Sequence, residues 1–436
     1  MNVRKTALDL LNKYELGDQY VNLTLYSHSL DGISGDERRI LTSLLYTTVE
    51  HKLTYDYYIS ALAKRDGSKI DPYTRNIIRL GIAQIIDINS VPDYAAVNET
   101  VKLSRNPGER SFVNGILRAI VKTKNSLPLP QREKNVSRYL SVKYSFPLDT
   151  VKLFVKLFGE EDAEKLLVYY NNEKYTDVFV NTTKATAKEV IASLNEAGLT
   201  ATVSEKNPNS LRIKTPFSVE RIDAFKEGKL FVQDVASTLA VSALAPQRGE
   251  RVIDVCSCPG GKSFAAAIMM ENEGEIFSFD LHESKLSLIE SGRDRMGLSV
   301  IRVTDRDATD PDQKLFATAD KVICDVPCSG TGVFSKKPDL RYKDISETKE
   351  LVALQREILE KSVSYLKVGG ELLYSTCTLN PDENSSVVDG FLSDNPNYCK
   401  VEFTTGGLNS VDGKLTLIPY LNNCDGFFMA KIKRIL

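Results

Sequence analysis

Two cysteines in the sequence each follow a short apolar run and stand beside a polar, turn-forming segment. Cys328 lies in DVPCSGTG (residues 325–332), after the run KVIC, and Cys377 ends the run ELLYSTC before TLNPDEN. Such apolar runs are typical of buried strands, and open α/β sheets carry their sites at the carboxyl ends of strands. If the two strands are neighbours, both thiols and the carboxylate of Asp325 face one cleft. The cysteines outside such motifs are expected to be small apolar core residues: Cys324, Cys399 and Cys424.

A glycine-rich loop, DVCSCPGGK (residues 254–262), joins the first predicted strand of the same sheet to a helix. Paired glycines let the backbone approach a ligand closely, and free N–H groups at a helix amino end bind carboxylates or phosphates. The next strand ends in Asp280, which is suited to ribose hydroxyls, and Asp307 after the third strand is suited to an adenine amino group. Singly, each feature also fits a plain turn or a helix cap. Together they suit an adenosine with a charged amino-acid tail, so the sequence predicts S-adenosylmethionine.

Two thiols and one acid beside a methyl donor fit methylation of cytosine at carbon-5. That carbon is too weak a nucleophile to take a methyl group unaided, but a thiolate added at carbon-6 turns the ring into an enamine. An acid near ring nitrogen 3 and the amino group helps only while it carries or shares a proton as charge builds there. A base must then remove the carbon-5 proton so that the thiol can leave, and a second cysteine is a candidate. The residues alone do not distinguish Cys328 from Cys377 as the attacking thiol.

Composition excludes several other classes of protein. The chain is 42% apolar and 26% charged, which is ordinary for a globular protein, and no apolar run is long enough for a membrane span. All seven cysteines lie from Cys256 onward, which does not fit a secreted disulfide scaffold and favours a reducing cytoplasm. Cys256 and Cys258 form a lone C-x-C without the four-ligand spacing of a zinc site, so no metal is expected.

The sequence pattern divides the chain into three parts. Residues 1–140 are predicted to be all-helical, because apolar residues recur at spacings of three and four, and the amino-terminal segment reads as a helix and not a secretory signal. Residues 141–230 combine a helical connector with a small α+β module of ferredoxin-like pattern. Residues 231–436 alternate strands and helices, which predicts a doubly wound parallel sheet of the Rossmann-like α/β class. The final strands are expected to be antiparallel.

Basic residues are candidates for contacts with a polyanion. Residues 1–140 hold 20 Lys and Arg against 15 Asp and Glu, whereas residues 231–436 hold 23 against 30. This asymmetry suggests a nucleic-acid partner for the first part, although it also fits ordinary scatter. Beside the Cys328 motif, SKKPDLRYK offers Lys336, Lys337, Arg341 and Tyr342 for phosphate near the cleft, unless it is only a solvated loop. The candidates in the first part are Arg38, Arg39, Arg75, Arg79, Arg105, Arg110 and Arg118.

The motifs DVCSCPGGK, DVPCSGTGVFSKKPDLRY and YSTCTLNPDEN resemble those of the RNA cytosine carbon-5 methyltransferases of the Fmu/Sun (RsmB-like) family. The helical first part resembles the NusB-like RNA-binding domain of the bacterial small-subunit ribosomal RNA members. The resemblance implies that Cys377 is the nucleophile, that Cys328 assists product release and that Asp325 contacts the cytosine. It also implies cofactor contacts from Cys256, Ser257, Cys258, Pro259, Gly260, Gly261, Lys262, Asp280, Asp307 and Asp325. Cys258 departs from the family, which usually has a small alanine-like residue there.

The expected function is therefore S-adenosylmethionine-dependent formation of 5-methylcytosine in small-subunit ribosomal RNA, by a cytoplasmic monomer with no membrane partner. Two alternatives remain open. One is a non-catalytic RNA-binding or ribosome-assembly factor that retains the fold, and the other is the same chemistry on transfer RNA. A cytosine inside a duplex hides both faces of its ring, so either substrate must present an unstacked base.

Overall fold

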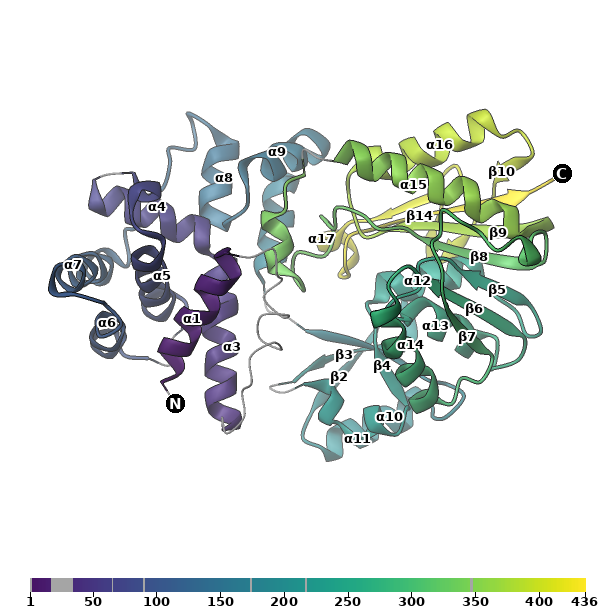
Figure 1. Cartoon of the computed structure of the whole chain (residues 1–436), viewed down its shortest axis with the longest axis horizontal. Helices are drawn as coiled ribbons and strands as arrows, with labels where there is room; N and C mark the ends of the chain where they lie inside the picture. Colours follow the sequence, from purple (N-terminus) through teal and green to yellow (C-terminus); the bar gives the residue numbers. More distant parts are fainter. Residues whose placement is uncertain are drawn as a thin grey trace. The chain divides into compact units, whose positions relative to one another are not determined.

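The computed structural model describes residues 2–16, 34–64, 66–88, 91–172, 175–215, 218–345 and 348–436 (Figure 1). The chain forms two compact units. The first, here called the helical unit, comprises Met1–Asn171 together with Lys337–Lys343. The second, here called the α/β unit, comprises Asn172–Lys336 and Asp344–Leu436. No helix of the described residues is both long and apolar enough to cross a bilayer.

The helical unit confirms the predicted all-α pattern. Its helices begin at the expected signals: Ser34 and Glu37 form a capping box at α3, and Asp71 and Asn106 cap α5 and α7, which both start with proline. In chain order the helices are α1 (Val3–Leu16), α3 (Gly35–Glu50), α4 (Lys52–Ala63), α5 (Pro72–Ile86), α6 (Asp93–Val101), α7 (Pro107–Thr123), α8 (Val136–Tyr144) and α9 (Leu148–Asn171), with a short 3-10 turn η1 (Gly67–Lys69). The helix η4 (Pro338–Tyr342) joins this unit from far along the chain.

The α/β unit begins with a small antiparallel sheet of order β2-β3-β1-β4. Its hairpin and crossover pattern agrees with the predicted ferredoxin-like module. The elements are β1 (Thr176–Val180), α10 (Ala187–Glu196), β2 (Thr200–Ser204), β3 (Asn207–Lys214), η2 (Val219–Arg221), α11 (Asp223–Lys226) and β4 (Leu230–Val232).

The large sheet has the order β10-β14-β9-β8-β5-β6-β7, with β13 on β14, and its centre is parallel as predicted. Strand β14 runs antiparallel to β9, which confirms the antiparallel end. The strands are β5 (Arg251–Asp254), β6 (Glu275–Asp280), β7 (Ile301–Asp305), β8 (Ala319–Asp325), β9 (Leu366–Thr376), β10 (Tyr398–Lys400), β13 (Lys414–Leu417) and β14 (Phe427–Arg434). The helices between them are α12 (Val235–Leu244), α13 (Gly261–Met269), α14 (Glu283–Met296), α15 (Thr348–Ser362) and α16 (Ser385–Asp394). Shorter elements are η3 (Gln313–Leu315), η5 (Val363–Tyr365), η6 (Pro381–Glu383), β11 (Thr404–Thr405), β12 (Leu408–Asn409) and α17 (Pro419–Asn422).

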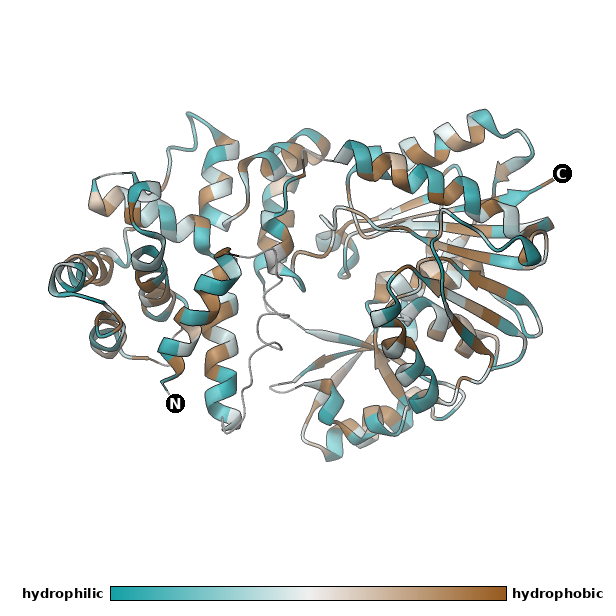
Figure 2. Ribbon diagram, viewed as in Figure 1, coloured by the Kyte–Doolittle hydropathy of each residue, from teal (hydrophilic) through white to brown (hydrophobic). Residues whose placement is uncertain are grey.

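Two apolar cores cover the two faces of this sheet. One core includes buried residues of α12, α13 and α14, and the other includes buried residues of α15 and α16. Successive residues of β9 alternate between them: Leu373 belongs to the first core, and Leu372 and Tyr374 belong to the second. In Figure 2 the strands of the large sheet are largely brown, whereas its helices carry brown and teal sides. Buried strands fix where the loops at their carboxyl ends emerge.

The strand order changes direction between β5 and β8. From β5 the chain proceeds outward to β6 and β7, and it then returns to β8 and β9 on the other side. Ligand sites of open α/β sheets lie at such a switch point, outside the carboxyl ends of the strands. The glycine-rich loop and the Cys328 motif follow these two central strands.

Candidate functional site

The glycine-rich loop is fixed by hydrogen bonds to the end of β6. Ser257 donates from its amide and its hydroxyl to the Phe279 carbonyl, at 2.8 and 2.9 Å. The Cys258 amide donates to Asp280 Oδ2 at 3.0 Å, and the His282 amide donates to Asp280 Oδ1 at 3.1 Å. Asp280 therefore lies beside the loop, as predicted, and its carboxylate holds backbone groups while its remaining lone pairs stay available.

The loop ends at Gly260, whose φ of +105° precedes helix α13. A Cβ at this position would lie 2.4 Å from the ring of Phe264, so only glycine fits. The amide groups of the first turn of α13 have no earlier helical carbonyl to bind, so this end of the helix favours a negative group. These features suit the carboxylate of an amino-acid tail.

Asp254, at the end of β5, is a buried carboxyl beneath this loop that the sequence did not single out. Its Oδ2 accepts a hydrogen bond of 2.7 Å from the Ser263 hydroxyl, while Oδ1 has no partner among the described residues. Burial raises the pKa of Asp254 to about 7. Its place at a strand end was visible in the sequence, but its complete burial depends on the packing of the neighbouring strands.

Lys262, in the first turn of α13, forms an ion pair with Asp325 at the end of β8. The Ser375 hydroxyl donates to Asp325 Oδ1 at 2.6 Å, and the Lys262 ammonium lies 5.2 Å from the centre of the Phe427 ring. The structure thus places two residues of separate predicted motifs in direct contact. It also adds Ser375, which lies two residues before Cys377 and holds the carboxylate in a fixed orientation.

Cys328 and Cys377 are neighbours, as the predicted pairing of their strands requires. Strands β8 and β9 are parallel, with Asp325 opposite Ser375. The two Sγ atoms lie 2.9 Å apart, and the Cys377 amide donates to Cys328 Sγ at 3.3 Å. The hydrogen bond with Cys377, burial and the charges of Cys377, Glu383 and Asp325 raise the pKa of the Cys328 thiol well above its usual value.

The other five cysteines differ from one another in how deeply they are buried. Cys324 and Cys424 are buried in the apolar cores, as predicted, whereas Cys399 is partly exposed in β10. Burial raises the pKa values of the Cys256 and Cys258 thiols. Across the described residues, no group of three or more His, Cys, Asp or Glu is arranged to hold a metal ion.

Asp307 lies two residues beyond β7, whose neighbour is β6. Its Oδ1 accepts hydrogen bonds from the amide and hydroxyl of Thr309, at 2.8 and 2.7 Å. Asp307 therefore stabilises its own turn at the cofactor edge of the sheet. A contact with adenine stays a prediction.

Two residues predicted to hold RNA phosphate beside the cleft have other partners, and these assignments are corrected. The Lys336 ammonium forms ion pairs with Asp177 at 2.9 Å, with Asp425 at 3.2 Å and with Asp234. The ammonium of Lys336 is therefore already bound by three carboxylates and is not free to hold phosphate. Arg341 is fully buried and donates to Glu50 and to the Tyr170 carbonyl.

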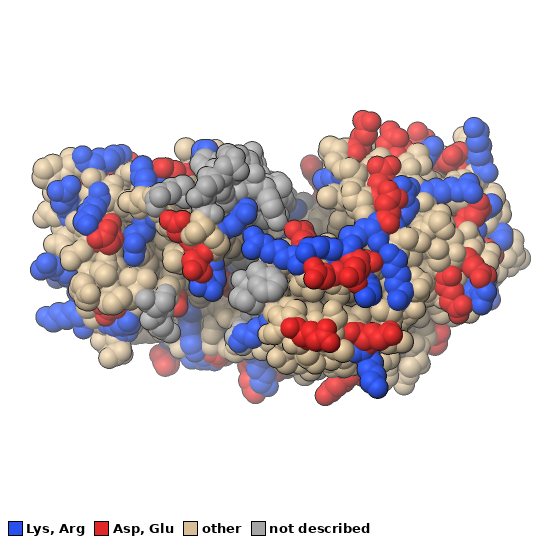
Figure 3. Space-filling model, turned by 90° about the horizontal axis from the view of Figure 1, so that it is seen from below, with Lys and Arg blue, Asp and Glu red and all other residues tan. Residues whose placement is uncertain are grey.

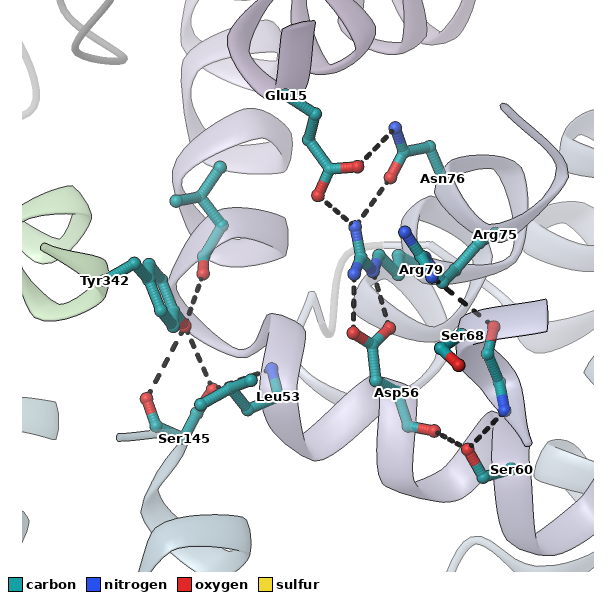
Figure 4. A network of polar contacts seen from close by, with 12 residues as sticks. Glu15, Leu53, Asp56, Ser60, Ser68, Arg75, Asn76, Arg79, Ser145 and Tyr342 are labelled. Atoms are coloured by element: carbon teal, nitrogen blue, oxygen red, sulfur yellow. Dashed lines mark hydrogen bonds and ion pairs between the residues drawn. The ribbon is translucent and has the colours of Figure 1, made fainter. Parts of the chain in front are cut away.

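The helical unit requires a similar correction. Arg79 is buried and ion-paired with Glu15 and Asp56, and it also donates to Asn76 (Figure 4). The Tyr342 hydroxyl donates to backbone carbonyls of α3. Figure 4 also shows Tyr342 beside Ser145. Lys337, Arg38 and Arg39 are exposed and stay candidates for RNA contacts. On the face of the helical unit seen in Figure 3, basic side chains are more prominent than acidic ones.

Sequence reasoning missed Glu383, a fully buried carboxylate behind the two cysteines. The only signal was its place in the motif TLNPDEN, where Asp382 and Asn384 are equally polar. Its role depends on which residues surround it, and those come from three separate segments.

Comparisons with known proteins cover nearly the whole chain. The model of the family described as 16S rRNA methyltransferase RsmB/F matches residues 241–433. The NusB family model matches residues 1–122, and the RsmF/B-like ferredoxin-like domain matches residues 147–220. These matches agree with the order of folds seen in the structure.

The relatives include a probable ribosomal RNA small subunit methyltransferase B of Synechocystis sp., which is 34% identical over 100% of both chains. The corresponding Bacillus subtilis protein is 31% identical, with 99% of each chain covered. Among solved structures, that of PH0851 has a TM-score of 0.83 and 27% identity, and covers 99% of this chain and 98% of its own. A methyltransferase homologue from Pyrococcus horikoshii has a TM-score of 0.60 and 25% identity, over 69% of this chain and 99% of its own. The chain therefore belongs to the family of 16S rRNA methyltransferases RsmB/F.

Proposed function

We propose that this protein is an S-adenosylmethionine-dependent methyltransferase that forms 5-methylcytosine in small-subunit ribosomal RNA. The observation that carries the proposal is the contact between Cys328 and Cys377, 2.9 Å apart beside the Asp325 carboxylate. Two thiols and an acid at the carboxyl ends of adjacent strands supply a nucleophile, a base and a group for the ring nitrogen. The relatives named ribosomal RNA small subunit methyltransferase B support the substrate class.

The residues present fit the proposed cofactor. The start of α13 offers free amides to a carboxylate, and Gly260 and Gly261 allow close approach of the backbone. Asp280 and Asp307 offer acceptors for hydroxyl and amino groups, and the Asp254 Oδ1 atom beneath the loop has no partner among the described residues. The residues proposed to hold the cofactor are Cys256 to Lys262, Asp280, Asp307 and Asp325. When bound, S-adenosylmethionine supplies an electrophilic methyl group.

In the proposed reaction Cys377 is the nucleophile. In the resting enzyme the Cys328 thiol donates its hydrogen bond to the Cys377 thiolate, which stabilises the charge on the attacking sulfur. The Cys377 thiolate forms a bond to carbon-6 of the cytosine, and the electron pair displaced toward carbon-5 makes that carbon nucleophilic. Asp325, held by Lys262 and Ser375, is proposed to lie beside ring nitrogen 3 and the amino group, where it stabilises the developing charge only while it carries or shares a proton.

Cys328 completes the proposed reaction after methyl transfer. Once Cys377 is bonded to carbon, its charge and its hydrogen-bond acceptor are gone, and two of the causes that raise the pKa of Cys328 disappear. Cys328 then releases its proton to water and accepts the proton of carbon-5. As the ring double bond reforms, the bond between sulfur and carbon-6 breaks and Cys377 leaves as a thiolate. The resting pair is restored.

The proposal also covers the partner and the organisation of the chain. We propose that residues 1–140 bind RNA, that residues 141–230 connect and support the catalytic part, and that residues 231–436 hold the reaction site. The protein is proposed to be cytoplasmic, because both thiols must stay reduced. It is also proposed to be a monomer. The target cytosine must leave its stack to expose carbon-6 to Cys377.

The test uses Cys377→Ala and Cys328→Ala proteins, each incubated with small-subunit ribosomal RNA and S-adenosylmethionine and run on denaturing gels. Cys328→Ala should accumulate a protein–RNA adduct, because it attacks but cannot complete release, and Cys377→Ala should form none. The reverse pattern would exchange the two roles. If neither variant forms an adduct and the wild-type protein transfers no methyl group, a non-catalytic RNA-binding role replaces the proposal. Transfer RNA in a parallel reaction distinguishes the two substrates.

A further inference from the structure

Glu383 lies in η6, and its side chain is completely buried between the loops that carry the two cysteines. Its Oε2 accepts hydrogen bonds from the Ser329 amide at 2.8 Å and from Gln355 Nε2 at 3.0 Å. Its Oε1 accepts from the Ser329 hydroxyl at 2.5 Å and from Asn380 Nδ2 at 3.2 Å, with the Thr378 hydroxyl at 3.4 Å. Both oxygens are therefore surrounded by donors.

These contacts give Glu383 five donors, of which three are N–H groups and two are hydroxyls. Within the described residues no Lys or Arg forms an ion pair with Glu383, so its charge is balanced by hydrogen bonds alone. Burying a carboxylate without a cation costs stability unless hydrogen bonds compensate. A position that carries such a cost calls for a role that a neutral residue cannot fill.

The hydroxyl groups that donate to Glu383 belong to residues next to the two cysteines. Ser329 follows Cys328 directly, and Thr378 follows Cys377 directly. The Ser329 and Thr378 hydroxyls lie 2.8 Å apart, so the carboxylate and the two hydroxyls form one network. Each cysteine is thus one residue away from a group held by Glu383.

Gln355 extends this network to the start of the Cys328 motif. Its Nε2 donates to the Pro327 carbonyl at 2.9 Å as well as to Glu383. The backbone is therefore fixed on both sides of Cys328, at Pro327 and at Ser329. On the side of Cys377, the hydroxyl of Tyr374 in β9 donates to the Glu383 carbonyl at 2.7 Å. This bond holds η6 against the end of β9 that precedes Cys377.

We propose that Glu383 is a positioning residue that binds the two cysteine loops to each other and so sets the separation of the two sulfurs. Its importance for catalysis rests on the function proposed above, whereas the positioning itself can be measured without substrate. Its charge has a second effect, because Glu383 is among the groups that raise the pKa of the Cys328 thiol. The same carboxylate thus favours a protonated Cys328 beside Cys377.

The test compares wild-type protein with Glu383→Ala and Glu383→Gln. Glu371→Gln is the matched control, because Glu371 is a carboxylate of the same strand-and-loop segment that pairs with Lys321, away from the cysteines. Dibromobimane, which becomes fluorescent when it bridges two neighbouring thiols, reports the separation of Cys328 and Cys377. Cys328→Ala sets the background from other thiols.

Wild-type and Glu371→Gln proteins should be bridged at the same rate, and Glu383→Ala at least about tenfold more slowly, because near-contact geometry controls such a second step. Unchanged bridging in a Glu383→Ala protein that keeps its far-UV circular dichroism would overturn the proposal. If that variant does not fold, Glu383→Gln decides the matter, since it keeps the volume but replaces one acceptor oxygen by an NH2 group, which cannot accept from the N–H donors that face each oxygen. Its bridging should also slow, and an unchanged rate would overturn the proposal.

A second measurement follows the rate at which iodoacetamide alkylates Cys328 as the pH rises, with the modified peptide identified by mass spectrometry. Removing the negative charge in Glu383→Gln should lower the pH midpoint of Cys328 alkylation, while Glu371→Gln should leave it in place. An identical midpoint in all three proteins would contradict the charge effect. Neither measurement contains RNA or a methyl donor, so failure of the proposed methylation would leave both results valid.

Discussion

The amide of Gly332 donates a hydrogen bond of 2.9 Å to the carbonyl oxygen of Cys377. The Gly426 amide in turn donates to the Gly332 carbonyl at 2.8 Å. Three segments that lie far apart in the sequence therefore meet through backbone groups at the proposed nucleophile. A side chain at Gly332 has no room there, because its Cβ would lie 2.0 Å from the Gly426 carbonyl oxygen.

Gly332→Ala should lower the rate of methyl transfer by about 100-fold, the cost of moving a reacting group by roughly 1 Å. The backbone must shift to relieve the contact, so unfolding should also become easier by about 1–3 kcal/mol. Steady-state methylation of small-subunit ribosomal RNA and urea unfolding followed by circular dichroism measure the two effects.

Gly115→Ala is the control for this glycine substitution. Gly115 lies within α7, and a Cβ there would meet no atom within 4 Å. Alanine in a helix interior should stabilise the helical unit by about 0.5–1 kcal/mol. Equal destabilisation by both substitutions would contradict the steric account of Gly332.

Replacing Lys336 tests its ion pairs with three aspartates, which contradict its predicted role in binding RNA phosphate. Lys336→Met removes the ammonium from Asp177, Asp234 and Asp425, and should lower the free energy of unfolding by about 3–5 kcal/mol near pH 8. The loss should be smaller near pH 5, because burial and the neighbouring charge of Asp234 already raise the pKa of Asp425 to about 7.

Urea unfolding at the two pH values checks this expectation, with Lys336→Arg as the charge-preserving control. A role for Lys336 in RNA binding would appear instead as a weaker, less salt-dependent RNA affinity with unchanged stability.

The ion pair of Arg341 and Glu50 should anchor residues 337–343 within the helical unit. Arg341 is fully buried, donates to Glu50 at 2.9 Å and lies 4.2 Å from the centre of the Phe146 ring. Arg341→Met should cost about 3–5 kcal/mol, because a buried carboxylate loses this cation. Adding Glu50→Gln should recover part of that loss, and a double-mutant cycle measured by denaturant unfolding gives the coupling. Additive losses would show that the pair does not act as one unit.

Asp254→Asn should change how stability depends on pH. The pKa of Asp254 is raised to about 7 in the folded protein, so between about pH 4 and 7 the folded state holds a proton that the unfolded chain has released. The wild-type free energy of unfolding should therefore fall as the pH rises through this window, by on the order of 1.4 kcal/mol for each unit of pKa displacement.

Asparagine cannot ionise, so this part of the slope should vanish in Asp254→Asn. Asp294→Asn serves as the control, because Asp294 is an exposed residue of α14. Unfolding at closely spaced pH values would reveal an unchanged slope if Asp254 were ionised throughout.

The sequence by itself determined the α/β class and the neighbouring positions of Cys328 and Cys377. It could do so because apolar runs fix the buried strands, and parallel strands place their carboxyl ends at one edge. Local signals also gave the glycine-rich loop and the start of α13, since a positive φ and a helix amino end depend on few residues. The resemblance to the family motifs then predicted different roles for the two cysteines, which their spacing alone could not distinguish.

Only the tertiary structure decided which charged residues are bound by other groups of the protein. Lys336 and Arg341 occupy a loop that looks solvated in the sequence, but Asp177, Asp425 and Glu50 reach them from distant segments. Burial and ion pairing depend on neighbours that are remote along the chain, so no local pattern predicts them. Glu383 follows the same rule: five donors from three segments make this one carboxylate different from the polar residues beside it.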